Sequence, residues 1–527
     1  MSPSSKRLLL AFAVAGALSC GGGSGTTAGS GGGPGAATGG QDAGGAGPAA
    51  SGSPSGDAGA AAGASGDGGA VSGTGGAAGA PATGTAGSGG AAAPAVSCAN
   101  VDATLPPEPV IPPACATLQA ALEITPGMPP SEATLDTTRI QSALSSCAAG
   151  QAVKLTAGGA NDAFVTGPLN IPSGVSLWID AGTTLFGSRD PAVYGQAAAL
   201  IGVHGVGSGI YGEGTIDGQG GEPQLGGTQS WWDVNGGGGS SPALIQVIGA
   251  TSFTLYKIRL QNSPMFHVKL GAAGFVVWGI TIKTPSSPMN SVGTKLTPAS
   301  AHNTDGVDPG QVASNGFIVY NQISVGDDHI AIKGGGNVKN LVIAHNHFEA
   351  GHGMSIGSET NGGVAHVAVC DLSIDGTNTG LSGGSSNGIR IKSDASRGGP
   401  VTDIMYSDVC VRGLTNPIIL TPKYSSATGA AIPAYSGITI QNFRSVSTSV
   451  IPKVTILGYD AFHMTGLTLD NVVVDDLPAT NVTASYANVT LGPGDVNFMP
   501  AGTSVDVTNA IAGSSSPNPC TGKWVAF

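Results

Sequence analysis

Residues Phe317–Ile343 read FIVYNQISVGDDHIAIKGGGNVKNLVI, and they contain two short apolar, β-branched runs, Phe317–Val319 and Leu341–Ile343. The runs begin 24 residues apart, and Gly, Asn and Asp lie between them. Similar runs elsewhere in the chain begin at Phe253, Phe275 and Val367. Short strands at a period in the low twenties, with no long amphipathic helix between them, favour a solenoid of stacked coils.

The interval from Phe275 to Phe317 is longer because residues 284–303 read as an insertion. Stacked runs would pair as strands about 4.8 Å apart. A β-sandwich is the alternative, although its turn signals usually recur every 8–12 residues or so. One helix is expected near residues 137–144, with Asp136 as its N-cap, where it would cap the open end of the first coil.

The chain has 527 residues and 88 glycines, and the glycines are concentrated near the start. Residues 21–96 are almost entirely Gly, Ala, Ser, Thr and Pro. Such a segment cannot bury enough apolar surface to offset the entropy of ordering, so we expect a disordered tether. The folded domain is then expected at residues 97–527.

Residues 1–20 have the pattern of an export signal. Lys6 and Arg7 precede an apolar run from Leu8 to Leu18, which is too short to span a bilayer. The ending Ala-Leu-Ser-Cys resembles a bacterial lipoprotein box, which would place a lipid on Cys20. An ordinary signal peptide with a cysteine near its cleavage site is the alternative. Export to a periplasm or cell surface, anchored through Cys20 or secreted, is expected in either case.

The formal net charge is −12, with only 20 Lys and Arg residues. A nucleic acid is therefore not an expected partner, and an anionic ligand can bind only where cations gather locally. Six cysteines remain after Cys20, and export permits disulfides among them. Of fifteen pairings we expect Cys115–Cys147 and a Cys98–Cys520 bond between the domain ends. No Cys/His cluster predicts zinc.

Polar residues recur one coil apart in the second half of the chain. Asp305 and Asp327 are 22 residues apart, and Asp328 and His352 are 24 apart. Arg390 follows His352 by 38 residues, which is one coil plus a Gly-rich loop at 376–387. A solenoid would bring these groups into a ladder on one face.

The ladder has the chemistry of a glycosidase. Inverting glycosidases hold an acid and a base about 6.5–9.5 Å apart, and clustered carboxylates keep one proton near neutral pH. Arg390 and Lys392, with Ile391 turned inward, would bind a substrate carboxylate. On a regular strand Asp327 and Asp328 would point to opposite faces, so the backbone must bend there.

Other interpretations fit each motif alone. An acidic cluster can bind Ca²⁺, exposed ions are usually a solvated patch, and a single His is more often structural than catalytic. Glycines beside His352, at Gly351 and Gly353, would leave room for a polymer near the backbone. The spacing of all these polar residues at one coil indicates a catalytic site. We expect this site to work without a metal or cofactor.

From about Ala116 to Val472 the sequence resembles glycoside hydrolase family 28, the polygalacturonases and their relatives. The resemblance includes Gly212–Gly220 (GEGTIDGQG), Trp231-Trp232 and Ser263–Val268 (SPMFHV), besides the polar segments. It is strongest to bacterial endo-acting polygalacturonases. It implies an all-β, right-handed parallel β-helix of the pectin-lyase-like kind, and hydrolysis of α-1,4-galacturonan with inversion.

By matching position, the resemblance makes Asp327 the general acid. Asp305 and Asp328 would activate the attacking water, and His352 would support the acid through a hydrogen bond.

The resemblance also implies the substrate contacts. Arg390 and Lys392 would hold a galacturonate carboxylate beside the scissile bond, and Tyr424 would contact the sugar. His329 departs from bacterial relatives, which more often have Asn, and it is expected to affect a neighbouring subsite or the pH optimum. The aligned coils place Cys370 opposite Ser407, out of disulfide reach of Cys410, so both thiols are expected to be unpaired in the core.

The expected substrate is a pectic polysaccharide, and the chain is expected to act as a monomer. Competing functions on the same fold are rhamnogalacturonan or xylogalacturonan hydrolysis, a Ca²⁺-dependent pectate lyase, and a non-catalytic surface polysaccharide-binding β-helix. The carboxylate column argues against a pure binding face, which would more typically carry aromatic platforms.

Overall fold

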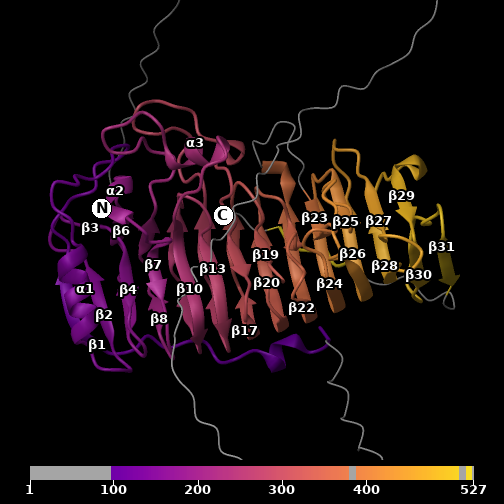
Figure 1. Cartoon of the computed structure of the whole chain (residues 1–527), viewed down its shortest axis with the longest axis horizontal. Helices are drawn as coiled ribbons and strands as arrows, with labels where there is room; N and C mark the ends of the chain where they lie inside the picture. Colours follow the sequence, from indigo (N-terminus) through magenta and orange to yellow (C-terminus); the bar gives the residue numbers. More distant parts are fainter. Residues whose placement is uncertain (1–96, 379–386, 510–517, 525–527) are drawn as a thin grey trace, which may run out of the picture. The chain divides into compact units, whose positions relative to one another are not determined.

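The computed structural model describes residues 97–378, 387–509 and 518–524. The expected signal sequence at 1–20, with Cys20, and the tether at 21–96 lie outside these residues, as does most of the expected Gly-rich loop. The described chain is a parallel β-helix, in which three ladders of parallel strands wind around one core (Figure 1).

The first ladder contains the β-branched runs that predicted the solenoid. Val276 pairs with Phe317, which pairs with Val342, so the long interval spans an insertion as expected. Its strands are β1 (Ala114–Gln119), β2 (Ala152–Thr156), β5 (Ser176–Ile179), β8 (Gly209–Tyr211), β11 (Thr254–Tyr256), β14 (Val276–Trp278), β17 (Ser314–Val319), β20 (Val338–Phe348), β22 (Val364–Asp375), β24 (Pro400–Arg412), β26 (Ala434–Val446), β28 (Thr465–Val474), β30 (Ala487–Leu491) and β31 (Val505–Asn509).

The second ladder is shorter and merges with the long strands of the first at β20. Its strands are β3 (Ala163–Thr166), β6 (Thr184–Gly187), β9 (Thr215–Asp217), β12 (Arg259–Gln261), β15 (Thr281–Lys283) and β18 (Gln322–Ser324).

The third ladder carries the polar residues singled out above. Its strands are β4 (Leu169–Ile171), β7 (Ala199–Val203), β10 (Ala243–Thr251), β13 (Val268–Ala273), β16 (Val307–Pro309), β19 (Ile330–Ile332), β21 (Met354–Ile356), β23 (Asn387–Lys392), β25 (Asn416–Thr421), β27 (Val454–Leu457) and β29 (Val482–Ser485).

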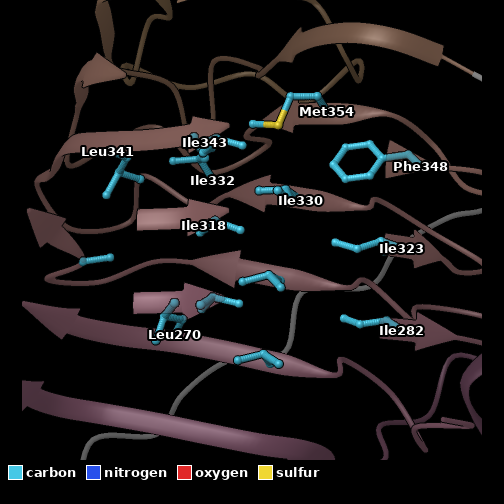
Figure 2. Packing of buried hydrophobic residues seen from close by; sticks show 14 of the residues in the cluster. Leu270, Ile282, Ile318, Ile323, Ile330, Ile332, Leu341, Ile343, Phe348 and Met354 are labelled. Atoms are coloured by element: carbon cyan, nitrogen blue, oxygen red, sulfur yellow. The ribbon is translucent and has the colours of Figure 1, made fainter. Parts of the chain in front are cut away.

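The core consists of aliphatic and aromatic side chains stacked coil on coil (Figure 2). Ile282 pairs with Ile323, and Ile323 pairs with Phe348, so the same inward position is apolar in three successive coils. Burying one such side chain stabilises the fold by about 1.5–3 kcal/mol. Because every coil repeats the pattern, the register of the ladders is fixed by the core.

The helices of the described residues are short. They are α1 (Thr137–Ser146), α2 (Pro191–Tyr194) and α3 (Trp231–Gly236), with 3₁₀ turns η1 (Val101–Thr104), η2 (Pro298–Ser300), η3 (Gly376–Asn378) and η4 (Ala479–Asn481). Among the residues that the structure describes, no helix has the length and apolarity to cross a membrane.

Helix α1 confirms the expected N-terminal cap, because Ile140 and Leu144 are buried in the core at the first coils. Asp136 is the N-cap residue of α1, as expected, but its side chain makes no capping hydrogen bond to the helix backbone. The Asp136 carboxylate accepts hydrogen bonds from Val165 N (2.9 Å) and Arg139 Nε (2.6 Å) instead of capping the helix. The expected Cys115–Cys147 disulfide is present and ties β1 to the end of α1.

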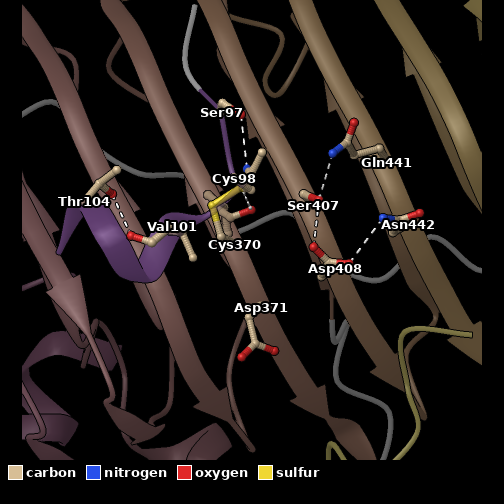
Figure 3. The surroundings of a disulfide bond; sticks show 12 residues. Ser97, Cys98, Val101, Thr104, Cys370, Asp371, Ser407, Asp408, Gln441 and Asn442 are labelled. Atoms are coloured by element: carbon tan, nitrogen blue, oxygen red, sulfur yellow. Dashed lines mark hydrogen bonds between the residues drawn. A yellow bond between two sulfur atoms is a disulfide. The ribbon is translucent and has the colours of Figure 1, made fainter. Parts of the chain in front are cut away.

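The other two disulfides differ from expectation. Cys98 bonds to Cys370, and Cys410 bonds to Cys520, so the expected Cys98–Cys520 bond and the two unpaired core thiols are both wrong. The register was correct, since Cys370 does lie opposite Ser407. The error has a physical cause: both cysteines lie where a terminal segment crosses the strands, and Figure 3 shows the N-terminal arm passing over β22 at Cys370.

Candidate active site

The polar column lies where the second ladder turns into the third. Val307, Ile330 and Met354 are buried register partners on β16, β19 and β21. Asp305, Asp328 and His352 each stand two residues before one of these positions. The coil spacing read from the sequence therefore brings the three together, as predicted.

Asp327 and Asp328 lie in the bend between β18 and β19 and not on a strand. Backbone hydrogen bonds stack this bend on its neighbours, because Gly306 N donates to Asp328 O (2.9 Å) and His352 N donates to Asp327 O (2.8 Å). The strict alternation of a strand does not apply in a bend, so both carboxylates reach the same cluster. One carboxylate or imidazole atom from each of Asp327, Asp328 and His352 lies within 4.8 Å of the others.

Asp327 and His352 form a partly exposed pair, with His352 Nδ1 2.9 Å from Asp327 Oδ1. Burial disfavours the charged form of both groups. The hydrogen bond and the opposite charges outweigh it, so the pKa of Asp327 lies below its ordinary value and the pKa of His352 lies above. In the free protein the proton shared by the pair therefore favours the imidazole.

Asp328 is fully buried and is held by two cations. Its Oδ1 accepts from Ser355 Oγ (2.8 Å) and from Arg390, and its Oδ2 accepts from Lys392 Nζ at 2.9 Å. Burial alone would raise the pKa of Asp328, but Arg390 and Lys392 outweigh it and hold that pKa well below its usual range. Asp328 is thus a permanently ionised carboxylate in the cluster.

Asp305 is buried beside Lys333, whose Nζ lies 3.3 Å from Asp305 Oδ2. Burial, assisted by the negative charge of Asp327, raises the pKa of Asp305 to about 7. Burial and the charge of Asp305 likewise raise the pKa of Asp308 well above its ordinary value. Within the described residues, Oδ1 of both Asp305 and Asp308 has no hydrogen-bond partner.

We expect the raised pKa of Asp305 to appear in the pH dependence of stability. Because the folded state holds the Asp305 proton more tightly than the unfolded state, stability falls as the pH rises from about 4 towards 7. Asp305→Asn removes this dependence. The unfolding free energy of wild type minus that of the variant should decrease with pH across this window, at a steepest slope near ~1.4 kcal/mol per pH unit. Urea titrations at several pH values measure it, and a difference that is flat or rising would contradict the raised pKa.

Tyr424 lies one coil beyond Lys392, and the Lys392 Nζ is 5.0 Å from the centre of the tyrosine ring. Tyr424 is 49% exposed, whereas the Lys392 side chain is 7% exposed. Arg390, Lys392 and Tyr424 therefore meet at the same place, although Tyr424 comes from the loop after β25.

The glycines beside His352 have a role in packing. A Cβ on Gly353, at φ +95°, would lie 2.3 Å from Asn387 O, and one on Gly351 would lie 2.6 Å from the His329 ring. Packing inside the protein by itself therefore requires glycine at both positions.

His329 is buried and stacks on Phe348, with ring centres 4.5 Å apart. Its Nε2 lies 3.2 Å from Glu349 O, and its Nδ1 accepts from Gly353 N at 3.1 Å. Burial lowers the pKa of His329 to about 4, so the ring is neutral near physiological pH. It supports the Gly353 backbone beside His352 from inside the fold.

Two residues of the cluster were missed in the sequence. Lys333 lies directly after β19, two residues beyond Ala331, just as Lys392 lies two residues beyond Arg390, so the same period of two would have found it. Ser355 is the register partner of Arg390 and lies one coil before it.

The donor set fits a metal poorly. Asp327, Asp328 and His352 have ligand spacing, but both oxygens of Asp328 already accept hydrogen bonds from cationic side chains. A divalent cation would have to enter beside Arg390 and Lys392, and Ca²⁺ prefers an all-oxygen site.

Comparison with known proteins agrees with this fold. Residues 131–493 match the family described as glycosyl hydrolases family 28. A polygalacturonase of Ralstonia solanacearum is 41% identical over 432 residues, covering 72% of this chain and 80% of that protein. An endo-polygalacturonase of Pectobacterium carotovorum subsp. carotovorum is 40% identical over 361 residues, covering 64% of this chain and 83% of that protein.

The solved structures include a polygalacturonase from Erwinia carotovora ssp. carotovora. It is 34% identical, aligns with a TM-score of 0.58, and the match covers 76% of this chain and 98% of that one. The three-ladder coil described above is the right-handed parallel β-helix of these enzymes. The chain belongs to glycosyl hydrolases family 28.

Proposed function

We propose that this glycoside hydrolase is a polygalacturonase, which cleaves α-1,4-galacturonosyl bonds within pectin or polygalacturonate with inversion. The similar proteins with this name support the substrate, and those named endo-polygalacturonase support cleavage within the polymer. The observation that carries the proposal is the arrangement of Asp328 between Arg390 and Lys392, directly beside the Asp327–His352 pair. Hydrolytic groups and carboxylate-binding cations thus occupy one cluster.

In this mechanism Asp327 gives a proton to the glycosidic oxygen as the bond from that oxygen to the anomeric carbon breaks. Water attacks the same carbon from the opposite face, and its proton passes to a carboxylate. Asp328 is ionised throughout the working pH range, but both of its oxygens accept hydrogen bonds from other side chains and its pKa is lowered, so it is the weaker base and serves mainly as a fixed negative charge. The unpartnered Oδ1 of Asp305 can hold the water, and Asp305 can accept a proton only above its raised pKa.

Asp327 must carry the proton at the moment of reaction, yet in the free protein the proton favours His352. Substrate binding is proposed to cause transfer of this proton from His352 to Asp327. When the polymer displaces water from the pair, separated charges become costly, and the neutral pair with the proton on Asp327 is favoured. His352 is therefore proposed to store the proton and to orient the acid.

Arg390 and Lys392 are proposed to bind the carboxylate of the galacturonate next to the scissile bond. Both cations are buried, so their attraction for an anion is screened less than at an open surface. Tyr424 offers an exposed ring beside them, on which the sugar can pack.

The test is incubation of the protein with polygalacturonate in the presence of a chelator. New reducing ends, a fall in viscosity before much sugar is released, and products of mixed length without ultraviolet absorbance are expected. Absorbing, unsaturated products that need Ca²⁺ would mean a lyase. Monomer as the sole product would contradict cleavage within the polymer, and an inert polymer would contradict the substrate.

We also propose that the protein is exported and acts as a monomer held at a membrane by lipid on Cys20. The basic start, apolar run and cysteine of residues 1–20 support this proposal. Replacing Cys20 by Ala should move the protein from the membrane fraction to the soluble fraction. A membrane-bound variant would contradict the lipid anchor.

A further inference from the structure

A second group of aromatic and basic side chains follows the third ladder beyond the cluster just described. At the carboxyl ends of neighbouring parallel strands, Tyr486 comes directly after β29, and Lys423 and Tyr459 lie two residues beyond the ends of β25 and β27. We call these three residues the distal cluster. The proposed mechanism uses none of them.

The strand register places the distal cluster in line with the active site. Lys392 pairs with Thr421, and Leu457 pairs with Ser485. Because Leu420 pairs with Ile456, Thr421 in turn stands beside Leu457. From Lys392 to Ser485 the row covers three strand spacings, which is about 14 Å.

Within this row, rings and cations are close to one another. The Lys423 Nζ lies 5.5 Å from the ring centres of both Tyr459 and Tyr486. Tyr424, the neighbour of Lys423 in sequence, lies against Lys392 in the same way. Two groups of basic and aromatic side chains therefore lie along the row, Lys392 with Tyr424 and Lys423 with Tyr459 and Tyr486.

The distal cluster is open to a ligand. Lys423 is exposed, and both tyrosines are partly exposed. Among the ion pairs of the described residues, none involves Lys423, in a chain whose net charge is −12. Lys392 and Arg390, in contrast, also hold the Asp328 carboxylate.

We propose that the distal cluster binds further galacturonate units of the polymer. These units lie on the same side of the scissile bond as the galacturonate whose carboxylate Arg390 and Lys392 are proposed to bind. This inference rests on the proposed function and assigns the direction in which the bound chain continues. The tyrosine rings supply faces for the sugars, and the Lys423 ammonium supplies the charge for a carboxylate. An acidic protein surface would otherwise repel a polyanion at this end.

The proposal predicts that substrate length matters on this side. Once a galacturonate oligomer reaches the distal cluster, kcat/KM should rise with each added unit in the wild type. In a Lys423→Gln, Tyr459→Ala double variant this rise should be lost. We expect about a 10-fold loss for the longest oligomers, mainly in KM, because two such contacts are together worth roughly one decade of affinity.

The experiment measures kcat and KM for galacturonate oligomers of defined length, from the shortest that wild type cleaves to the octamer. The shortest substrate should lose less than about 2-fold, because the catalytic cluster is intact. Lys339→Gln, which removes an exposed cation on β20, and Tyr320→Ala, which removes a 41% exposed ring beside β17, are the matched controls. Thermal unfolding checks that each variant is folded, and Lys423→Gln alone serves where the double variant is not.

Binding separates this inference from the proposed function. In an Asp327→Asn background, calorimetry with the octamer should show about 10-fold weaker binding when the distal cluster is altered. If wild type cleaves galacturonan but the variants keep its length dependence and octamer affinity, the distal cluster is not a binding site. If wild type cleaves no galacturonan, the proposed hydrolysis fails, and a loss of octamer binding in the altered cluster would still support the site.

Discussion

Asp327→Asn should lower kcat on polygalacturonate by about 10²–10⁴-fold, because an amide cannot supply the proton that the glycosidic oxygen needs. The side chain keeps its size, and it can still hydrogen-bond to His352. We therefore expect the thermal unfolding temperature and the KM for the polymer to change little. Initial rates of reducing-end release measure the effect.

The chain offers a close control for this substitution. Asp403 and His366 form an Asp–His pair of similar exposure on neighbouring strands of the first ladder, 2.6 Å apart. Asp403→Asn removes a carboxylate from such a pair without touching the cluster, and its activity should equal that of wild type. Equal losses of activity in the two variants would mean that Asp327→Asn acts through general destabilisation. Full activity in Asp327→Asn would mean that Asp327 is not the general acid.

Arg390→Ala should damage both stability and substrate binding. It leaves the buried Asp328 carboxylate with Lys392 and Ser355 alone, and breaking a buried ion pair on one side costs about 3–5 kcal/mol. It also removes the group proposed to bind the substrate carboxylate, so KM should rise. Arg390→Lys restores the charge without the paired donors and should recover stability more fully than activity.

Arg412→Ala is the comparison for Arg390→Ala. Arg412 holds Asp375 through two hydrogen bonds of 2.9 and 2.6 Å, but its side chain is 30% exposed. Its removal should cost about 1 kcal/mol or less and leave KM unchanged. If urea unfolding showed equal losses for the two variants, Asp328 would not depend on Arg390 as the structure indicates.

The sequence was sufficient for the parts of the site that repeat with the coil. Asp305, Asp328 and His352 hold the same offset from buried register partners, so counting residues placed them together. Lys333 does not hold this offset, since it follows the register partner Ile330 by three residues, and the count therefore passed over it.

Features that do not repeat could not be read in this way. The bend that brings Asp327 beside Asp328 breaks the alternation of a strand, so it was required by the expected cluster and was not itself visible in the repeat. The Cys98–Cys370 bond depends on where the N-terminal arm crosses the coils, and the intervals of the repeat carry no information about that path. Whether His352 or Asp327 holds the shared proton depends on the balance between burial and neighbouring charges. That balance follows from interatomic distances, which the sequence does not contain.

The central claim is inverting hydrolysis of galacturonan by this cluster, and the anomeric form of the first products tests it most directly. Polygalacturonate would be cleaved with chelator present while NMR follows the new reducing ends before they equilibrate. Cleavage of α-linked sugars with inversion predicts that the β-anomer appears first and the α-anomer grows in later. If the α-anomer appeared first, or if the new non-reducing ends were unsaturated, the account would be contradicted.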